Sequence, residues 1–145
     1  MNERSIKMLF ADDDAEDRTI VSDVCDELGF SESVAIVNDG EEVLSFLDAL
    51  DDNLPDLIVL DVNMPRLDGK QTLQRLKQSP RYAHIRVVML STSANPLDLR
   101  QCMLIGASHY YTKPRSYDKY VELIQWFYNY TLDTSIKALS EESAR

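Results

Sequence analysis

The stretch IKMLFADDDAEDR, residues 6–18, contains a short apolar run that ends abruptly in Asp12, Asp13 and Asp14. The apolar run is long enough for a buried strand, whereas three adjacent carboxylates repel one another and are costly to remove from water. Ligands of an open parallel sheet bind outside the carboxyl ends of its strands, and a divalent cation stabilises clustered carboxylates. The stretch therefore predicts a strand whose carboxyl end faces a cation site.

The remaining sequence repeats this strand-then-helix arrangement four more times. Apolar runs predict strands over residues 7–11, 34–37, 57–60, 87–90 and 109–112. Helical spacing of apolar residues, together with cap and breaker residues, predicts helices over residues 16–28, 41–50, 69–78, 96–105 and 117–132. Such strict alternation is typical of an α/β fold, here a doubly wound (βα)5 arrangement with a five-stranded parallel sheet and helices on both faces.

Composition restricts the class of protein. With 145 residues, 44% apolar and 28% charged, the chain is expected to form one domain over residues 1–132, followed by a polar tail, residues 133–145, with no output domain. No apolar run approaches the roughly 18 residues of a membrane span, and no apolar targeting segment opens the chain, so we expect a cytoplasmic protein. The net charge of −10 disfavours binding to nucleic acid or anionic membranes and suits a cation or a basic partner. Cys25 and Cys102 are expected to be core thiols.

Polar side chains follow each of the five predicted strands. The residues at these strand ends are Asp12, Asp13, Asn38, Asp39, Asp61, Ser91 and Lys113. Because the strand ends meet at one edge of a parallel sheet, we expect the acids to form a cluster that holds Mg²⁺, which prefers oxygen ligands. Asp14 and Asp39 are also explained as a helix-start residue and a turn residue, and turn chemistry is an alternative for the other acids.

Four stretches, in order along the chain, resemble one known family. They are ADDD after the first strand, LIVLDVNMPRLDG around the third, VVMLSTS at the fourth and GASHYYTKP at the fifth. Taken together, they resemble the receiver domain of two-component response regulators, over about residues 5–132. The resemblance implies a flavodoxin-like fold and a bacterial signalling protein.

The resemblance implies a role for each residue of the acidic cluster. Asp61 would accept a phosphoryl group as an acyl phosphate, with Mg²⁺ as the cofactor. Asp13 would bind the metal directly and Asp12 mainly through water. The backbone carbonyl of Asn63, two residues after the acceptor, would supply a further protein ligand.

The resemblance also implies roles at the fourth and fifth strands. The hydroxyl of Ser91, rather than that of the following Thr92, would contact the phosphoryl oxygens. Lys113 would pair with the acceptor carboxylate and then with the phosphoryl group, and the peptide bond between Lys113 and Pro114 would be cis. Tyr110 occupies the position of the aromatic switch residue.

These roles imply a response regulator that takes its phosphoryl group from a histidine of a sensor kinase or a phosphotransfer protein. Slow hydrolysis of its own acyl phosphate would be its only catalysis. One rival function is a phosphohydrolase of the haloacid dehalogenase type, in which Asp12 would be the nucleophile and Asp14 the second acid, although Glu16 does not fit that motif. A second rival is a degenerate receiver that only binds a partner. The late stretch QWFYNY weakly resembles single-domain receivers that pair with phytochrome-type kinases.

Surplus apolar residues on two helices predict an interface. A helix packed on a sheet needs one apolar stripe, and the fourth and fifth helices each carry a second. The residues on these second stripes are Leu97, Leu104, Leu123, Trp126 and Tyr130. The opposite faces, which include Leu99, Met103 and Tyr117, are expected to face the core. We expect a homodimer through the face formed by helix four, strand five and helix five, and coverage by residues 133–145 is the alternative.

Overall fold

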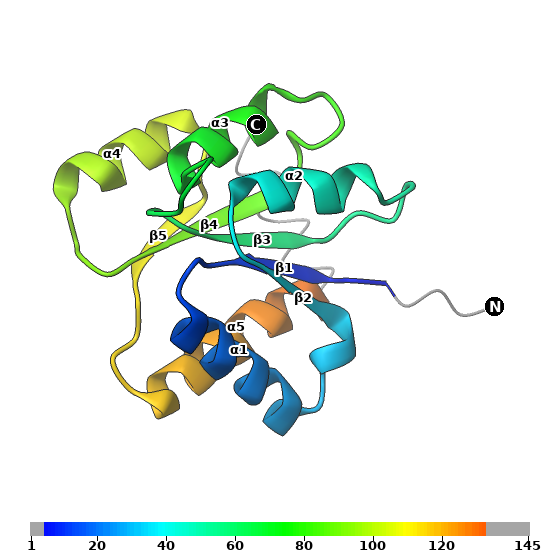
Figure 1. Ribbon diagram of the computed structural model, residues 1–145, viewed down its shortest axis with the longest axis vertical. Coiled ribbons are helices and arrows are strands. Elements are labelled where there is room, and N and C mark those ends of the chain that lie inside the picture. Colours follow the sequence, from blue (N-terminus) through cyan, green and yellow to red (C-terminus); the bar gives the residue numbers. More distant parts are fainter. Residues whose placement is uncertain (1–4, 133–145) are drawn as a thin grey trace.

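One sheet of five parallel strands forms the centre of the computed structural model, which describes residues 5–132 (Figure 1). The strands are β1 (Met8–Ala11), β2 (Val34–Val37), β3 (Leu57–Asp61), β4 (Arg86–Ser91) and β5 (His109–Thr112). They lie in the order β2-β1-β3-β4-β5, with β2 and β5 at the edges. The predicted doubly wound (βα)5 fold is confirmed. The order places the ends of β1 and β3 side by side, where such sheets bind ligands.

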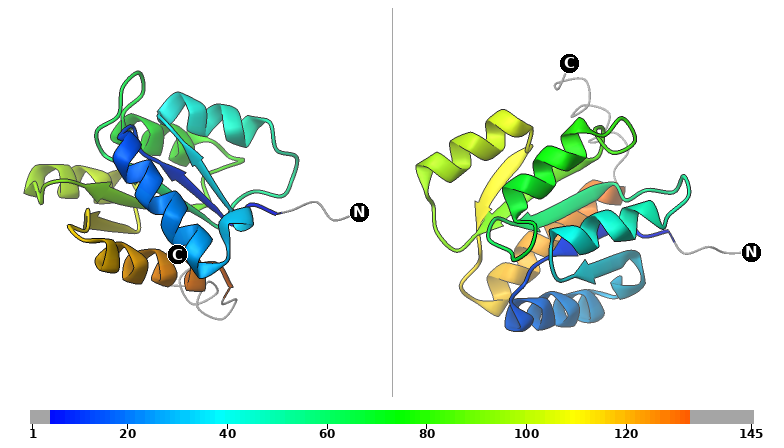
Figure 2. Two further views of the ribbon diagram at one scale, coloured as in Figure 1. Left: turned by 60° about the horizontal axis from the view of Figure 1, so that its bottom comes forward. Right: turned by 45° about the horizontal axis from the view of Figure 1, so that its top comes forward.

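Helices cover both faces of the sheet. They are α1 (Ala15–Leu28), α2 (Gly40–Asp48), α3 (Gly69–Gln78), α4 (Pro96–Ile105) and α5 (Tyr117–Leu132), with a 3₁₀ turn, η1 (Ser31–Ser33), before β2. Figures 1 and 2 show α1 and α5 together on one face and α2, α3 and α4 on the other. The predicted helices begin or end within one or two residues of the observed ones.

Four of the helices begin at a short polar N-cap residue. The side chains of Asp14, Asp39, Asp68 and Asn95 each accept a hydrogen bond from a backbone N–H of the turn that follows. These bonds satisfy donors that the helix itself leaves without a partner. The helix-start role of Asp14 is therefore confirmed, and Asp39 is the N-cap of α2 as well as a turn residue. Gly29, with a φ of 83°, ends α1 in the left-handed region.

Successive side chains of each strand point to opposite faces of the sheet, and the apolar ones form one core on each face. Met8 and Phe10 of β1 pack with α1 and α5, whereas Leu9 and Ala11 pack with the opposite cluster. Both cysteines are buried free thiols, as predicted. Because side chains alternate along every strand, the fold fixes which residue at each strand end faces which helix layer.

The fourth helix is more exposed than its sequence predicts. Leu99 and Met103, expected in the core, are 43% and 42% exposed, while Cys102 of the same helix is fully buried. The helix packs beside α3 and the edge strand β5, so only a narrow part of its surface is covered. Tyr117, at the first position of α5, is 38% exposed, so its assignment to the core is also wrong.

Two further expectations concern the chain as a whole. None of the helices within residues 5–132 is long and apolar enough to cross a membrane. The predicted polar tail, residues 133–145, and its proposed coverage of the second apolar stripe lie outside the described residues.

Candidate functional site

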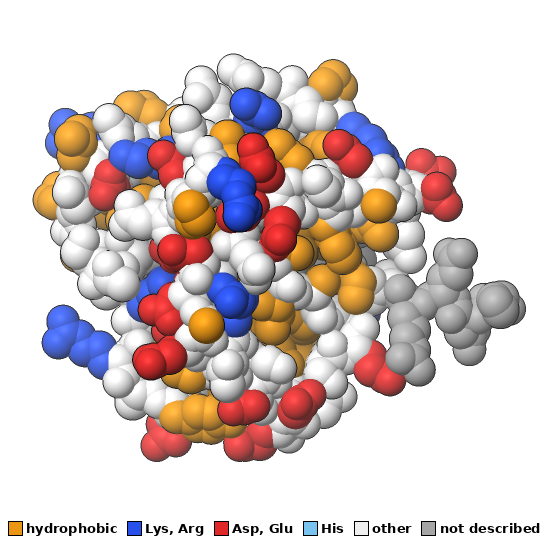
Figure 3. Space-filling model, in the orientation of Figure 1, with side chains coloured by type: hydrophobic (Ala, Val, Ile, Leu, Met, Phe, Trp, Pro, Cys, Tyr) orange, Lys and Arg blue, Asp and Glu red, His pale blue; other side chains and the backbone are white. Residues whose placement is uncertain are grey.

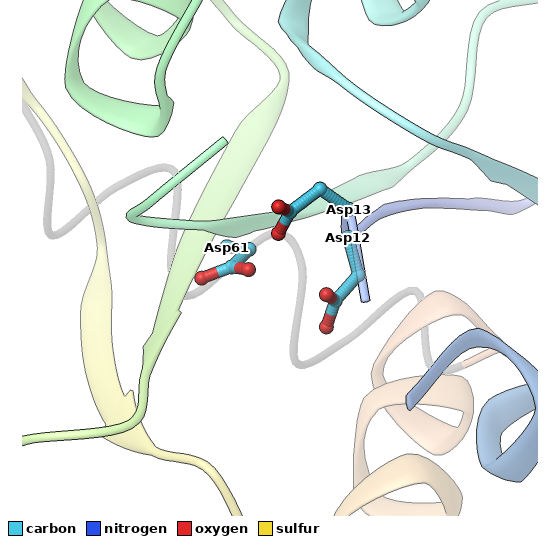
Figure 4. A group of neighbouring side chains, drawn as sticks. All are labelled: Asp12, Asp13 and Asp61. Carbon is cyan, nitrogen blue, oxygen red and sulfur yellow. The ribbon is translucent and has the colours of Figure 1, made fainter. Parts of the chain in front are cut away.

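Three carboxylates meet at the carboxyl edge of the sheet. Asp12 and Asp13 follow β1, Asp61 is the last residue of β3, and oxygen atoms of all three lie within 4.8 Å of one another. Asp12 and Asp61 are buried, whereas Asp13 is exposed. Figure 4 shows the carboxylate of Asp13 turned toward Asp61. This set of oxygen atoms fits a hard divalent cation that keeps water on its open side, as Mg²⁺ does.

Lys113 places a buried positive charge among these carboxylates. Its Nζ atom lies 3.0 Å from Asp12 Oδ2, 2.9 Å from Asp17 Oδ2 and 3.2 Å from Asp61 Oδ2. The lysine follows β5, and its backbone N–H donates to the carbonyl of Ser91 over 2.7 Å, which ties the end of β5 to β4. Burial lowers the pKa of the ammonium, but the hydrogen bonds that it donates to Asp17 and Asp12 outweigh burial and raise the pKa above its ordinary value.

The environment of Asp61 shifts its pKa upward. Burial and the neighbouring charge of Asp12 raise the pKa of the carboxyl to about 7, although Lys113 and the N–H of Asn63 oppose the shift. Burial raises the pKa of Asp12 as well. In the absence of a cation, clustered acids therefore favour a proton on the site, and a bound cation favours the ionised carboxylates that a nucleophile requires.

The loop after β3 holds Asp61 in place. The N–H of Asn63 donates to Asp61 Oδ1 over 3.2 Å, and the N–H of Gly69 donates to the carbonyl of Val62 over 2.9 Å. A Cβ atom at position 69 would lie 2.2 Å from the carbonyl oxygen of Asp61. Glycine is therefore required at this position for the loop to close against the end of β3. The predicted ligand Asn63 lies in this loop, directly beyond the acidic cluster.

Ser91 and Tyr110 lie on the side of the site nearer α4. Ser91 is the buried last residue of β4, and its Oγ accepts a hydrogen bond of 3.3 Å from the N–H of Ser93. Thr92 is exposed. Tyr110, on β5, is half-buried against the α2–α4 side of the core, and its hydroxyl lies 3.5 Å from the carbonyl of Ser93. Both predicted switch residues thus contact the same residue of the β4–α4 loop.

The predicted cis peptide bond is wrong for this structure. No cis bond occurs within residues 5–132, so the bond between Lys113 and Pro114 is trans. Proline lowers the preference for trans to about 0.5–1 kcal/mol without abolishing it, so the residue pair alone does not select an isomer.

Two site residues were not predicted from the sequence. Asp17, in the first turn of α1, pairs with Lys113 through Oδ2 and accepts from the hydroxyl of Tyr120 over 3.3 Å through Oδ1. Tyr120 is a buried residue of α5. From the sequence alone, Asp17 is one more acid in the first turn of a predicted helix, where acids are common. Its partners lie about a hundred residues away and become visible only in the fold.

The structure does not favour the arrangement that a haloacid dehalogenase would need. Asp12 Oδ1 accepts the backbone N–H of Asp14 over 2.9 Å, and its Oδ2 pairs with Lys113. Asp14 is exposed and caps α1, so the two acids do not face a common substrate position. The acids that cluster with Asp12 are Asp13 and Asp61, and Asp14 is not among them.

Comparisons with known proteins agree with this geometry. A family model for the response regulator receiver domain matches residues 8–125. Response regulator Rcp1 of Synechocystis is 29% identical over 131 residues, which cover 88% of this chain and 89% of Rcp1. A protein-glutamate methylesterase/protein-glutamine glutaminase of Trichodesmium erythraeum is 32% identical over 124 residues, or 82% of this chain. Those residues are 34% of the methylesterase, so the chain spans about a third of that relative.

Solved structures of response regulators have the same fold. The phosphorylated cyanobacterial phytochrome response regulator RcpA superimposes with a TM-score of 0.78 and 27% identity, covering 90% of this chain and 96% of RcpA. The Mn²⁺-bound form of Rcp1 superimposes with a TM-score of 0.72 and 30% identity, covering 88% of this chain and 94% of that one. The fold, the acidic cluster with its lysine and the match over most of the sequence lead to one conclusion. This chain belongs to the family of response regulator receiver domains, which act in two-component signal transduction.

Proposed function

We propose that Asp61 is the phosphoacceptor of this receiver domain, and that its donor is a phosphohistidine of a sensor kinase or a phosphotransfer protein. An oxygen of the ionised carboxylate attacks the phosphorus atom. The new O–P bond forms as the P–N bond to the donor imidazole breaks, and the imidazole nitrogen keeps the electron pair. The product is an acyl phosphate whose slow hydrolysis resets the protein and is its only catalytic activity.

The residues that would hold Mg²⁺ are Asp12, Asp13, Asp61 and the backbone carbonyl of Asn63. The bound cation supplies positive charge to the phosphoryl oxygens and keeps the acids ionised. Asp13 is the exposed member of the cluster and is suited to direct coordination. Asp12 has both oxygens engaged within the protein, which suits contact through water.

Lys113 and Ser91 complete the charge compensation. Phosphoryl transfer depends on in-line positioning and on stabilising the charge of three oxygens. The ammonium of Lys113 is already paired with Asp61 at 3.2 Å, and the hydroxyl of Ser91 stands at the end of the neighbouring strand. The observation that carries the proposal is this buried ion pair between Lys113 and Asp61 beside Asp12 and Asp13.

The face formed by α4, β5 and α5 is the proposed output surface, and its partner is a second copy of the chain. Trp126 is 55% exposed, Leu97 58% and Leu104 80%. Leu123 and Tyr130, predicted for the same face, are half-buried. Hydrophobic side chains show as orange atoms at the left edge of Figure 3, where Figure 1 places α4. Exposed apolar side chains on adjoining elements are typical of an interface.

Incubation with acetyl phosphate and Mg²⁺ tests the acceptor. Intact-protein mass spectrometry should show one added phosphoryl group on the unaltered protein and none on the Asp61→Asn variant. The amide keeps the shape of the side chain but is not a nucleophile. Asp52→Asn, which removes an exposed loop carboxylate, is the matched control and should be labelled normally. Labelling of Asp61→Asn at the normal level would reject the proposal.

A further inference from the structure

Lys113 is shared among more carboxylates than phosphoryl transfer requires. An ammonium group has three N–H donors, and the structure places three carboxylates around it. Two of them, Asp12 and Asp61, belong to the proposed site. The third, Asp17, comes from α1, and at 2.9 Å it makes the shortest of the three contacts.

Asp17 is fixed in this position from a second direction. The hydroxyl of Tyr120 lies 3.3 Å from Asp17 Oδ1, so the two oxygens of the carboxylate have separate partners on different elements. Tyr120 is 3% exposed, and α5 packs against α1 at this point. A favourable interaction with the helix dipole would explain why acids occur in the first turn of α1, at Glu16 as well as at Asp17. It does not account for an aspartate oriented toward both Lys113 and a buried tyrosine.

We propose that Asp17 is a positioning residue that competes with the acceptor for Lys113 and so lowers the affinity of the site for a phosphoryl group. The inference rests on the proposed function of Asp61. A phosphoryl group on Asp61 needs at least one of the three N–H donors, and all three face carboxylates before it arrives. The ammonium must therefore weaken one contact, and the charge of Asp17 opposes its move toward the phosphoryl oxygens.

Neutralising Asp17 should therefore strengthen binding of a phosphoryl mimic. Binding of beryllofluoride in the presence of saturating Mg²⁺, followed by ¹⁹F NMR, is the measurement. The Asp17→Asn variant keeps the shape of the side chain and should bind beryllofluoride about tenfold more tightly, because a neutral amide holds an ammonium less strongly than a carboxylate does. Asp17→Glu restores the charge and should return the affinity toward that of the unaltered protein.

Glu16→Gln is the matched control, because it removes the same charge from the neighbouring exposed residue of the same helical turn. It should change the affinity less than twofold, since long-range charge effects at the surface are screened. Equal or weaker binding by Asp17→Asn, or an equal gain in Glu16→Gln, would overturn the competition. Failure of the unaltered protein to bind beryllofluoride, or unchanged binding by Asp61→Asn, would instead contradict the proposed function.

A structure of the unaltered protein with beryllofluoride tests the same inference without any variant, should Asp17→Asn not fold. The proposal predicts that Lys113 Nζ moves toward the fluoride atoms and that its contact with Asp17, now 2.9 Å, lengthens beyond ion-pair distance. A lysine that contacts fluoride while keeping its present distance to Asp17 would show that the two do not compete.

Discussion

Lys113 Nζ lies 3.2 Å from Asp61 Oδ2, in an ion pair that joins the end of β5 to the end of β3 across the intervening strand β4. Neither side chain is more than 8% exposed. The pair brings a buried ammonium from the end of an edge strand to the proposed acceptor.

Removal of this cation should destabilise the metal-free protein. At pH 8, Lys113→Met would leave the buried carboxylates of Asp12 and Asp61 without their ammonium partner, and we expect a loss of about 3 kcal/mol in the free energy of unfolding. Mg²⁺ should recover much of this loss, because it replaces the missing positive charge. Urea unfolding with and without Mg²⁺ measures both effects. Lys119→Met, which removes an exposed partner of Glu122, should cost less than about 1 kcal/mol. Equal stability of the two variants would contradict the role of Lys113 in neutralising the buried carboxylates.

Activation should move Ser91 and Tyr110 together. At present both contact Ser93, Ser91 through Oγ and Tyr110 through its hydroxyl. We expect beryllofluoride to draw Ser91 toward the phosphoryl position and to release Tyr110 from Ser93 so that its ring turns inward. Comparison of crystal structures with and without beryllofluoride tests this expectation. A bound structure with Ser91 and Tyr110 in their present positions would reject the coupling.

Charge placed on the α4–β5–α5 face should prevent self-association. Trp126 packs edge-on against Tyr111 and Phe127, yet more than half of it is exposed. Trp126→Glu should convert a dimer to a monomer in sedimentation velocity, with an unchanged circular dichroism spectrum. Glu41→Lys, which changes an exposed residue of α2 outside this face, should leave the dimer intact. A protein that is monomeric at high micromolar concentration, with or without phosphorylation, would show that this face serves another partner.

Buried thiols should make stability fall at alkaline pH. Burial, with a smaller contribution from Asp26, raises the pKa of Cys25 from 9.0 to about 12. Because the folded state holds this proton more tightly than the unfolded state, stability is full below pH 9 and decreases as the pH rises toward 12. Urea unfolding at pH 8, 9.5 and 11 should show a shallower decrease for Cys25→Ala than for the unaltered protein. The same slope in both proteins would contradict the assigned pKa.

The fold and the acidic cluster were predictable because both depend on simple periodic rules. Apolar runs alternating with helical patterns specify parallel strands, and residues at their carboxyl ends meet at one edge. Asp12, Asp61 and Lys113 could be located in this way. Asp17 could not, because an acid in a first helical turn needs no partner, and its contact with Lys113 depends on how α1 packs. The prediction of which side of α4 is buried was wrong for a different reason. Apolar residues occur on every side of that helix, so their periodicity does not identify the buried side.

Reductive trapping of the phosphorylated protein identifies the acceptor residue itself. Borohydride reduces an acyl phosphate to an alcohol, which marks the phosphorylated aspartate as homoserine, and peptide mass spectrometry then locates it. After incubation with acetyl phosphate and Mg²⁺, we expect homoserine in place of Asp61, with Asp12 and Asp13 unchanged. Homoserine in place of Asp12 or any other aspartate, with Asp61 unchanged, would contradict Asp61 as the acceptor.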